Sequence, residues 1–354
     1  MFTILDRYLG RSVLFGTSLV LGVFAALFIF LVFVDALPDY GQGRFGLYEL
    51  VRYVLLSQPR KLYEIFPVVV LIGTLLGLSS LALNSELIAI RAAGVSKARI
   101  IGAAMKTGLL MVVVAALVGE YVVPQAETEA QAGRAEALAG SLKRADGGLW
   151  LRDGGAFVNI GEVLPDKSLL RVNIYEVAPD FQMRQHVYAE RARYQEGRWY
   201  LEQVQASRID RRQIETQREE KRVWGAGLTP QVVSLFTVRP EALSIGQLYG
   251  YIAHLQRNNL DAARYVLAMY QKLLMPLATA LMIVLAAPFV FRPARSGGMA
   301  QRVFLGIVFG LAFVVVHRTL GHLAVIYGVP PLFAAVAPLI LFLGIAYGLV
   351  RRVA

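Results

Sequence analysis

The sequence has no cysteine and few charged residues for its length. Without cysteine, disulfide frameworks, thiolate metal sites and cysteine nucleophiles are all excluded. Only 17% of the 354 residues are charged and 56% are hydrophobic, whereas soluble globular chains carry about 25% charged and about 45–50% apolar residues. The chain also has no Gly-Lys dipeptide, and therefore no Walker A motif. A soluble enzyme is excluded, and any transport against a gradient must take its energy from another chain.

The apolar residues are concentrated in long runs. Three runs contain no Asp, Glu, Lys or Arg, and each is long enough to cross ~30 Å of hydrocarbon as a helix; they are Ser12–Val34, Ile65–Ser85 and Thr319–Val350. Together with apolar stretches that carry a few charges, they predict six membrane spans, at about 12–37, 65–83, 99–123, 265–291, 302–321 and 331–350. The first run is longer than the apolar core of a signal peptide, which has about 7–15 residues, so we expect it to span the membrane.

Lysine and arginine are unevenly distributed between the loops, which predicts the orientation. Short segments on one side carry two acidic and ten basic residues, the latter being Arg7, Arg11, Arg91, Lys97, Arg99, Arg292, Arg295, Arg302, Arg351 and Arg352. The opposite loop 38–64 has four basic and three acidic residues, and the segment 124–264 has nineteen and eighteen. The positive-inside rule therefore places both termini in the cytoplasm and the segment 124–264 outside. No nucleic-acid partner is expected, because a DNA-binding protein would concentrate its positive charge on the soluble domain.

The segment from about 148 to 237 has the composition of an all-β domain. The expected strands are Leu149–Leu151, Ala156–Ile160, Arg171–Val177, Met183–Tyr188, Ala192–Gln195, Trp199–Gln205 and Glu215–Val223. Turn sequences such as Asp153-Gly154-Gly155 separate them, and the regular spacing predicts one antiparallel sandwich or curved barrel. The segment has no paired carboxylates, Ser-His-Asp arrangement or metal-ligand spacing, and we expect its lone His186 to be solvated.

Amphipathic segments join this domain to the spans. Residues from Val122 to about Leu142 are expected to continue the third span outward as a helix. On the return, Ser244-Ile245-Gly246-Gln247 has a capping-box pattern, and apolar residues on one face after it predict an interfacial helix before Asp261 caps the fourth span. The predicted organisation is therefore 1–123 for the first three spans, 124–264 for the β-domain with its helical stalks, and 265–354 for the last three spans.

The depth of the charged residues limits the possible functions. A charge at the bilayer centre costs about 2.5–3.5 kcal/mol on insertion scales, and at ~1.5 Å per residue no ionisable residue falls clearly at the midplane. Proton- or sodium-coupled carriers place such residues there, so a secondary carrier is disfavoured. Lys106, Lys272 and Arg318 are each explained as snorkelling anchors. Lys272 and Arg318 also form, with Arg134 and Arg44, an outer-leaflet ring that would suit an anionic lipid head group.

A short helix is predicted at 84–94, in the loop between spans two and three. Asn84 or Ser85 would cap its N-terminus and Gly94 would end it. Its apolar residues would lie at the inner membrane face and fit a partner's groove; they are Leu87, Ile88 and Ile90. Glu86 has two explanations that the sequence leaves open, a favourable interaction with the helix dipole or an ion pair with an arginine of a partner.

The alternative function is an integral-membrane enzyme that modifies lipid or peptide. It would need a catalytic constellation near one membrane surface, for which only His317 and His322 in the fifth span are candidates. Five residues apart, these histidines point to different helix faces, which disfavours the enzyme. We therefore expect no catalytic residue and no metal site.

Seven short motifs occur in order along the whole chain. They are Leu5-Asp6-Arg7-Tyr8, Phe33-Val34-Asp35, Asn84–Gly94, Gly119-Glu120-Tyr121-Val122-Val123-Pro124, Gly148-Leu149-Trp150, Ala242-Leu243-Ser244-Ile245 and Gly328-Val329-Pro330-Pro331. Each is weak alone, but together and in this order they resemble the LptF/LptG permease family of the lipopolysaccharide export ABC transporter. The first and fifth motifs favour the G-type over the F-type subunit.

This resemblance implies a multi-pass α-helical protein of the cell inner membrane, with six transmembrane helices and an inserted all-β, jellyroll-like periplasmic domain. It implies a non-catalytic permease that pairs with an LptF-type subunit on an LptB-type ATPase dimer. That dimer would bind ATP and Mg²⁺, so no cofactor is expected on this chain. Lipopolysaccharide would be taken from the outer leaflet of the inner membrane and passed to a periplasmic bridge of LptC-type and LptA-type proteins.

The resemblance also implies roles for particular residues. The helix 84–94 would be the coupling helix that contacts the ATPase; its contact residues would be Glu86, Leu87, Ile90 and Arg91. Arg134 matches a basic position that faces the lipid phosphates, beside the head-group candidates Arg44, Lys272 and Arg318. The chain departs from the family where lysines flank Phe33-Val34-Asp35, since Val32, Pro38 and Asp39 stand there. Arg44 or residues of a partner are expected to substitute for them.

Overall fold

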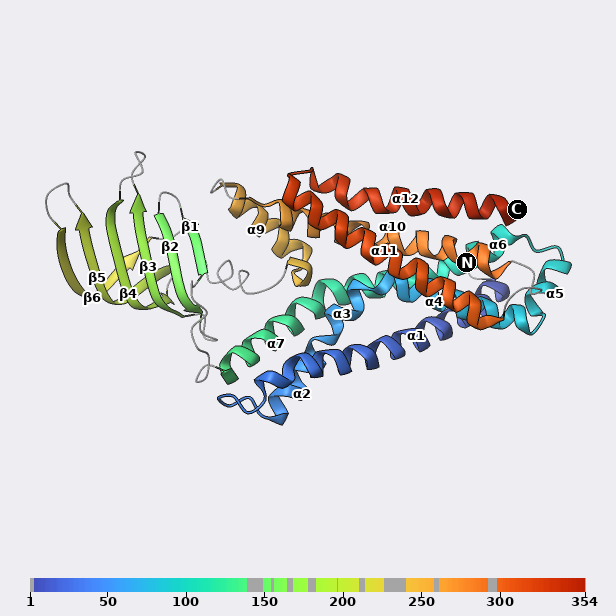
Figure 1. Cartoon of the computed structure of the whole chain (residues 1–354), viewed down its shortest axis with the longest axis horizontal. Coiled ribbons are helices and arrows are strands. Elements are labelled where there is room, and N and C mark those ends of the chain that lie inside the picture. Colours follow the sequence, from blue (N-terminus) through green and yellow to red (C-terminus); the bar gives the residue numbers. More distant parts are fainter. Residues whose placement is uncertain are drawn as a thin grey trace.

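The computed structural model shows a bundle of long helices with a β-sheet beyond one end and both chain termini at the other (Figure 1). We call these the sheet end and the termini end. The structure describes residues 3–138, 149–153, 156–163, 168–177, 183–195, 197–209, 214–225, 240–257, 261–291 and 298–353. The turns expected at 154–155, 178–180 and 196, and Gly148 of the fifth motif, lie outside these ranges.

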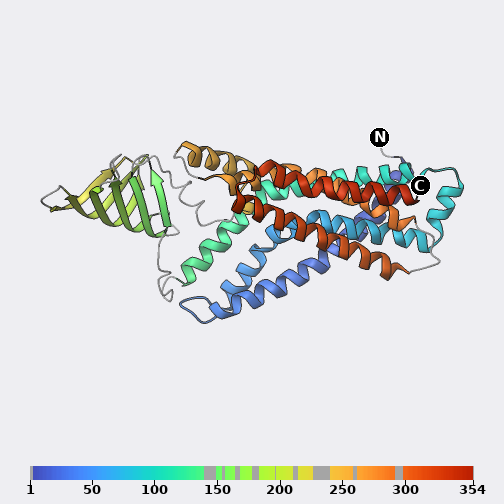
Figure 2. The same cartoon turned by 45° about the horizontal axis from the view of Figure 1, so that its top comes forward.

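Six helices within the described residues are long and apolar enough to cross a membrane. They are α1 (Ile4–Ala36), α4 (Phe66–Leu83), α6 (Lys97–Leu117), α10 (Ala263–Val290), α11 (Met299–Tyr327) and α12 (Pro331–Val353). The six predicted spans are thereby confirmed. Figure 2 shows these helices gathered at the termini end, with α1 diverging from α10, α11 and α12 toward the sheet end.

Shorter elements connect the long helices. They are η1 (Leu37–Asp39), α2 (Leu47–Leu56), α3 (Gln58–Glu64), α5 (Glu86–Ala92), η3 (Pro240–Ala242) and α9 (Ile245–Arg257). At the end of α6, a single π-helical turn, η2 (Val118–Val122), leads directly into α7 (Val123–Leu138). The third span therefore continues outward as a stalk, as predicted.

α4 is the central helix of the bundle, and α1 packs on it with almost no space between the backbones. A Cβ on Gly16 would lie 2.3 Å from the carbonyl oxygen of Gly73, and a Cβ on Gly77 would lie 2.3 Å from the carbonyl oxygen of Ser12. Gly73 and Gly77 form a small-xxx-small pair, which lets helices approach closely in lipid. By contrast, most of α1 and α11 remains outside the core of this chain.

The inserted segment forms a six-stranded antiparallel sheet in which each strand pairs with its neighbour along the chain. The strands are β1 (Leu149–Asp153), β2 (Ala156–Val163), β3 (Leu169–Val177), β4 (Met183–Gln195), β5 (Arg198–Ile209) and β6 (Ile214–Trp224). The antiparallel β-domain is confirmed, although the described strands make one sheet rather than two packed layers. β4 is continuous where the sequence predicts two strands, because no turn residue interrupts it and both Ala189 and Arg191 pair with β5.

One face of this sheet carries a buried apolar core and the other carries an aromatic stack. The core includes Val172, Ile174 and Val187, each at most 3% exposed. On the opposite face, the ring of His186 stacks on Tyr175 at 4.7 Å and lies 3.1 Å from the side-chain oxygen of Asn173. His186 is half-buried, so the expected solvated histidine is only partly solvated, because it lies on the face opposite the core and stacks on Tyr175. Burial lowers the pKa of His186 from its ordinary value of 6.5.

α9 begins with the predicted capping box. The backbone N–H of Gln247 donates to Ser244 Oγ at 3.1 Å, and the Gln247 side chain accepts from the Ser244 N–H at 2.9 Å. Its apolar face is buried against Val123 and Ala268, so this face packs on the protein, whereas amphipathicity alone predicts that it faces the membrane surface. Asp261 caps α10 through the N–H of Ala263, as expected.

We predict that Gly16→Ala destabilises the bundle by about 1–3 kcal/mol, because the added methyl group would meet the α4 backbone and force the helices apart. Gly22→Ala is the matched control on the same helix, since a Cβ there has no atom within 4 Å. Thermal unfolding of the purified chain in detergent measures both. Equal midpoints for the two variants would contradict the close packing of α1 on α4.

We further predict that the sheet loses stability as the pH falls below 6.5. His186 has a lowered pKa in the folded state, so the unfolded chain binds the proton more readily and acid favours unfolding. The measurement is amide hydrogen exchange of β3 and β4 in the full chain, corrected for the intrinsic exchange rate at each pH. The protection factors should fall by less than about tenfold for each unit by which the pH is lowered, because unfolding binds only one additional proton. The variant His186→Gln should lose this dependence, and a slope that survives the substitution would exclude His186 as its source.

Candidate functional site

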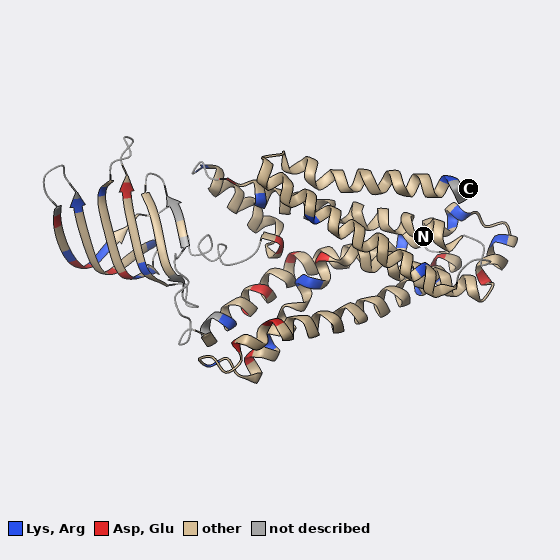
Figure 3. Ribbon diagram, viewed as in Figure 1, with Lys and Arg blue, Asp and Glu red and all other residues tan. Residues whose placement is uncertain are grey.

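Charged side chains of the helical part gather at the two ends of the bundle, while the long helices between them are almost free of charge (Figure 3). Two groups of residues therefore define the candidate site. One surrounds α5 at the termini end, and the other joins α3 and α7 at the sheet end.

α5 is the short helix predicted in the second loop. Ser85 stands at its N-cap, as predicted, although it has φ 62° and its side chain makes no capping hydrogen bond. Gly94 follows the helix with φ +87°, a conformation that glycine adopts at little cost. The helix thus stops where the sequence predicts.

The residues of α5 are not equally accessible to a partner. Leu87 is 3% exposed and packs into the core of the bundle, because it faces α4. Ile90 is partly buried against the same core, whereas Ile88 is 65% exposed and Arg91 is exposed. The expectation that Leu87 faces a partner is therefore wrong, and Ile88 is the accessible apolar residue.

The N-terminal turn of α1 is tied to α5 and α6 by polar contacts. The hydroxyl group of Tyr8 donates a hydrogen bond to the carboxylate of Glu86. Asp6, which is 1% exposed, pairs with Arg99 at 3.0 Å and with Lys106 at 2.8 Å. Lys106 is therefore an ion-pair partner of Asp6, a contact that its depth alone does not predict.

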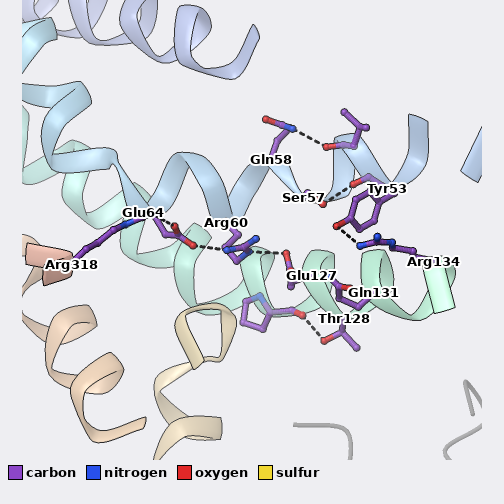
Figure 4. Close-up of polar contacts among 12 residues, drawn as sticks. Tyr53, Ser57, Gln58, Arg60, Glu64, Glu127, Thr128, Gln131, Arg134 and Arg318 are labelled. Atoms are coloured by element: carbon purple, nitrogen blue, oxygen red, sulfur yellow. Dashed lines mark hydrogen bonds and ion pairs between the residues drawn. The ribbon is translucent and has the colours of Figure 1, made fainter. Parts of the chain in front are cut away.

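At the sheet end, Arg60 of α3 is a buried cation held by two carboxylates (Figure 4). Its guanidinium lies 3.0 Å from Glu127 of α7 and 2.7 Å from Glu64, and the side chains of Arg60 and Glu127 are 8% and 1% exposed. Burial by itself would lower the pKa of Arg60, but the two carboxylates outweigh it and raise the pKa. Glu64 also pairs with Arg318 of α11 at 3.1 Å, so this cluster joins three segments that are distant in the sequence.

The four head-group candidates have different environments. Arg134 pairs with Asp39 at 2.6 Å and lies over the ring of Tyr53. The side chain of Arg318 is 62% exposed, and Arg44 is exposed in the loop before α2. These three residues lie at the sheet end.

Lys272 is not available to a head group. Its ammonium group donates to the backbone carbonyl oxygens of Gly119 at 2.7 Å and Leu243 at 2.6 Å, and Glu120 lies 3.8 Å away. The side chain is only 6% exposed. The π-helical turn η2 supplies both Gly119 and Glu120, so Lys272 holds the start of the stalk instead.

The histidines of the alternative enzyme hypothesis do not form a catalytic pair. His317 stacks on Phe313 within α11, with 5.6 Å between the ring centres, whereas His322 is exposed on the same helix. Within the described residues, neither histidine forms a hydrogen bond or an ion pair with a carboxylate. The contacts of His317 and His322 therefore give no support to the hypothesis of an integral-membrane enzyme.

The fold and these two polar ends define a six-span membrane protein with an inserted antiparallel sheet. Residues 7–352 match the family model described as lipopolysaccharide export system permease LptF/LptG, and the chain belongs to this family. It is 35% identical to the lipopolysaccharide export system permease protein LptG of Escherichia coli K12 and 34% identical to LptG of Haemophilus influenzae. Each comparison covers 99% of both chains. The resemblance to the family, and to its G-type member, is confirmed.

Arg60 and Glu127 are absent from the sequence-based candidates. The spacing of Arg60 and Glu64 is typical of an i,i+4 pair and could have identified half of the cluster. Glu127 lies 67 residues from Arg60, and no local pattern connects them.

We predict that Glu127→Gln lowers stability by about 1–3 kcal/mol, because Arg60 would stay buried with one charged partner fewer. Glu129→Gln is the matched control on the same helix. Its exposed pair with Arg52, at 3.6 Å with side chains 61% and 48% exposed, contributes about 0–1 kcal/mol. Thermal unfolding in detergent compares the two, and an equal effect of both substitutions would show that the buried cluster does not stabilise the stalk.

Proposed function

We propose that this chain is the G-type permease subunit that couples the ATP cycle of an LptB-type ATPase dimer to the extraction of lipopolysaccharide. It pairs with an LptF-type subunit and takes lipopolysaccharide from the outer leaflet of the inner membrane. It passes the lipid to a periplasmic bridge of LptC-type and LptA-type proteins. ATP and Mg²⁺ bind the ATPase, and this chain carries no cofactor. Membership of the lipopolysaccharide export permease family supports the cargo and the transport role.

The orientation follows from the charges. The described basic residues that the sequence groups on one side include Arg7, Arg11, Arg91 and Arg351, and they belong to elements at the termini end. We therefore place the termini and α5 in the cytoplasm and the β-domain in the periplasm. In this orientation α5 faces the nucleotide-hydrolysing partner, and the sheet faces the bridge.

The observation that carries the proposal is the exposed α5 at the cytoplasmic end. Glu86 stands in its first turn and Ile88 is 65% exposed, so a carboxylate and an apolar side chain are available together. An arginine of the ATPase could pair with Glu86 while Ile88 enters an apolar groove. Because Leu87 of the same helix packs into the core of the bundle, a push on α5 would be transmitted to the spans.

The proposed head-group contacts lie at the opposite end. Arg318 and Arg44 are exposed, and Arg134 is held by Asp39 and Tyr53. Guanidinium groups bind phosphate in a bidentate manner. We assign the lipid phosphates to these three arginines, with Asp39 orienting Arg134 where the family pattern has a lysine.

Glu86→Ala should reduce ATP-dependent release of lipopolysaccharide from reconstituted vesicles by about 10–100-fold, the effect of losing one charge-assisted hydrogen bond of about 1.5–3 kcal/mol. Tyr8→Phe is the matched control, because it removes the contact within the chain and leaves the carboxylate for the partner. Release by Tyr8→Phe should stay close to that of the unaltered protein.

Two results would contradict this role for Glu86. Unchanged release by a folded Glu86→Ala variant would exclude it from coupling. An equal loss in both variants would show that Glu86 acts by holding α1 and not by binding the ATPase. Thermal unfolding of each variant verifies that it is folded.

A further inference from the structure

Two helical stalks connect the bundle to the β-domain, α7 on the outward path of the chain and α9 on the return path. They belong to different parts of the bundle, because α7 continues α6 through the π-helical turn η2, whereas α9 leads into α10. α7 and α9 lie apart at the sheet end (Figure 1). A contact that holds both stalks therefore has to lie at their base.

The turn η2 leaves one backbone carbonyl without a helical donor. The N–H of Val123 donates to the carbonyl oxygen of Val118, five residues back, whereas an α-helix would give this N–H to Gly119. The next residue is Pro124, which has no N–H. The carbonyl oxygen of Gly119 thus lacks the donors four and five residues ahead, and a buried carbonyl without a donor is costly.

The side chain of Lys272 on α10 supplies the missing donor. Its ammonium group donates to the carbonyl oxygen of Gly119 at 2.7 Å and to that of Leu243 at 2.6 Å. Leu243 lies directly before α9, so one side chain binds the base of both stalks. Hydrogen bonds from a charged donor are strong, and the Lys272 side chain is only 6% exposed, so water hardly competes for it.

Glu120 of η2 adds a direct bond between the stalks. Its two carboxylate oxygens lie 3.1 Å and 2.9 Å from the N–H of Ile245. Ile245 is the first residue of α9, and its N–H has no acceptor within the helix. A carboxylate at this place is also favoured by the helix dipole. Glu120 therefore ties the hinge of one stalk to the N-terminus of the other.

The ring of Tyr63 on α3 closes the contact from the other side. A Cβ on Gly119 would lie 2.2 Å from this ring, so only glycine lets η2 sit here. The ammonium group of Lys272 lies over the same ring, 5.6 Å from its centre, an arrangement that attracts a cation. A shift of η2 along α10 would separate the ammonium group from both the ring and the carbonyl.

We propose that Lys272 is a positioning residue that fastens both stalks to α10, with η2 as the hinge that moves when this contact opens. The contact sets the angle between α7 and α9, and with it the orientation of the β-domain on the bundle. Single π-helical turns inside longer helices are frequent at functional sites. The proposal concerns the arrangement of this chain alone, so it can fail or succeed independently of the proposed transport role.

The test measures the distance between the two stalks in the full chain. The sequence has no cysteine, so Glu129→Cys on α7 and Tyr249→Cys on α9, both at exposed positions, carry the only two nitroxide labels. Double electron–electron resonance should give one narrow distance distribution for this labelled parent. Lys272→Met should broaden or shift that distribution by about 1–5 Å, the size of helix shifts at packed interfaces.

Arg264→Met is the matched control, because Arg264 is exposed on α10 about two turns before Lys272. It should keep the distribution of the parent. Glu120→Ala is a second variant, which keeps the carbonyl bonds of Lys272 and removes only the direct bond to α9. It should broaden the distribution less than Lys272→Met, and it decides the question if Lys272→Met does not fold. Circular dichroism and thermal unfolding establish which variants are folded.

Two results would overturn the proposal. The distribution of the parent in every folded variant of Lys272 and Glu120 would show that neither side chain holds the stalks. An equal broadening by Arg264→Met would attribute the effect to the loss of any positive charge from α10.

A second measurement rests on the proposed function and separates positioning from folding. In the reconstituted transporter, Lys272→Met should keep ATP hydrolysis and lower the release of lipopolysaccharide about tenfold, as for the loss of one charge-assisted hydrogen bond. A parallel loss of hydrolysis and release would mean that Lys272 only maintains the fold. Unchanged release with a broadened distribution would support the stalk contact and contradict a role of the β-domain in passing on the lipid.

Discussion

Hydrocarbon does not solvate charge, and this constraint determines where the polar interactions of the helical part are located. Asp6 and its two cationic partners lie at the termini end, while Arg60 and its two carboxylates lie at the sheet end. Between them the helices pack through apolar side chains and glycine contacts such as Gly16 against Gly73. The middle of the bundle therefore supplies close packing, and the ends supply the ionic contacts that orient the helices.

The ionic contacts tie the same two chain segments together at both ends. The segment α1–η1 carries Asp6 at one end and Asp39 at the other, and α6–η2–α7 carries Lys106 and Arg134. A movement of one segment along the other would have to break both pairs. Since Leu87 of α5 packs into the core that α1 and α6 share, a displacement at the termini end has a continuous mechanical path to the stalk below the sheet.

The spans, the stalk and the position of α5 could be predicted because each depends on local composition. The role of Lys272 could not be predicted from local composition. Its place near a membrane surface suggests a lipid contact, but η2 and the segment before α9 bring two carbonyl groups to its ammonium. Leu87 is a similar case, since an apolar residue on a short loop helix fits a partner or the chain's own core equally well. His186 is only partly solvated because Tyr175 in the neighbouring strand stacks on it, which local sequence does not show.

The sequence by itself determined the membrane class, the six spans, the inserted β-domain and the family, because apolar length, turn chemistry and motif order are properties of neighbouring residues. The tertiary structure decided which charges are paired, which side of α5 is accessible and how Lys272 joins the two stalks. Those features depend on residues as far apart as Arg60 and Glu127, or Asp6 and Lys106. Only the packing of whole helices against one another brings such residues within a few ångströms, so no local sequence pattern predicts these contacts.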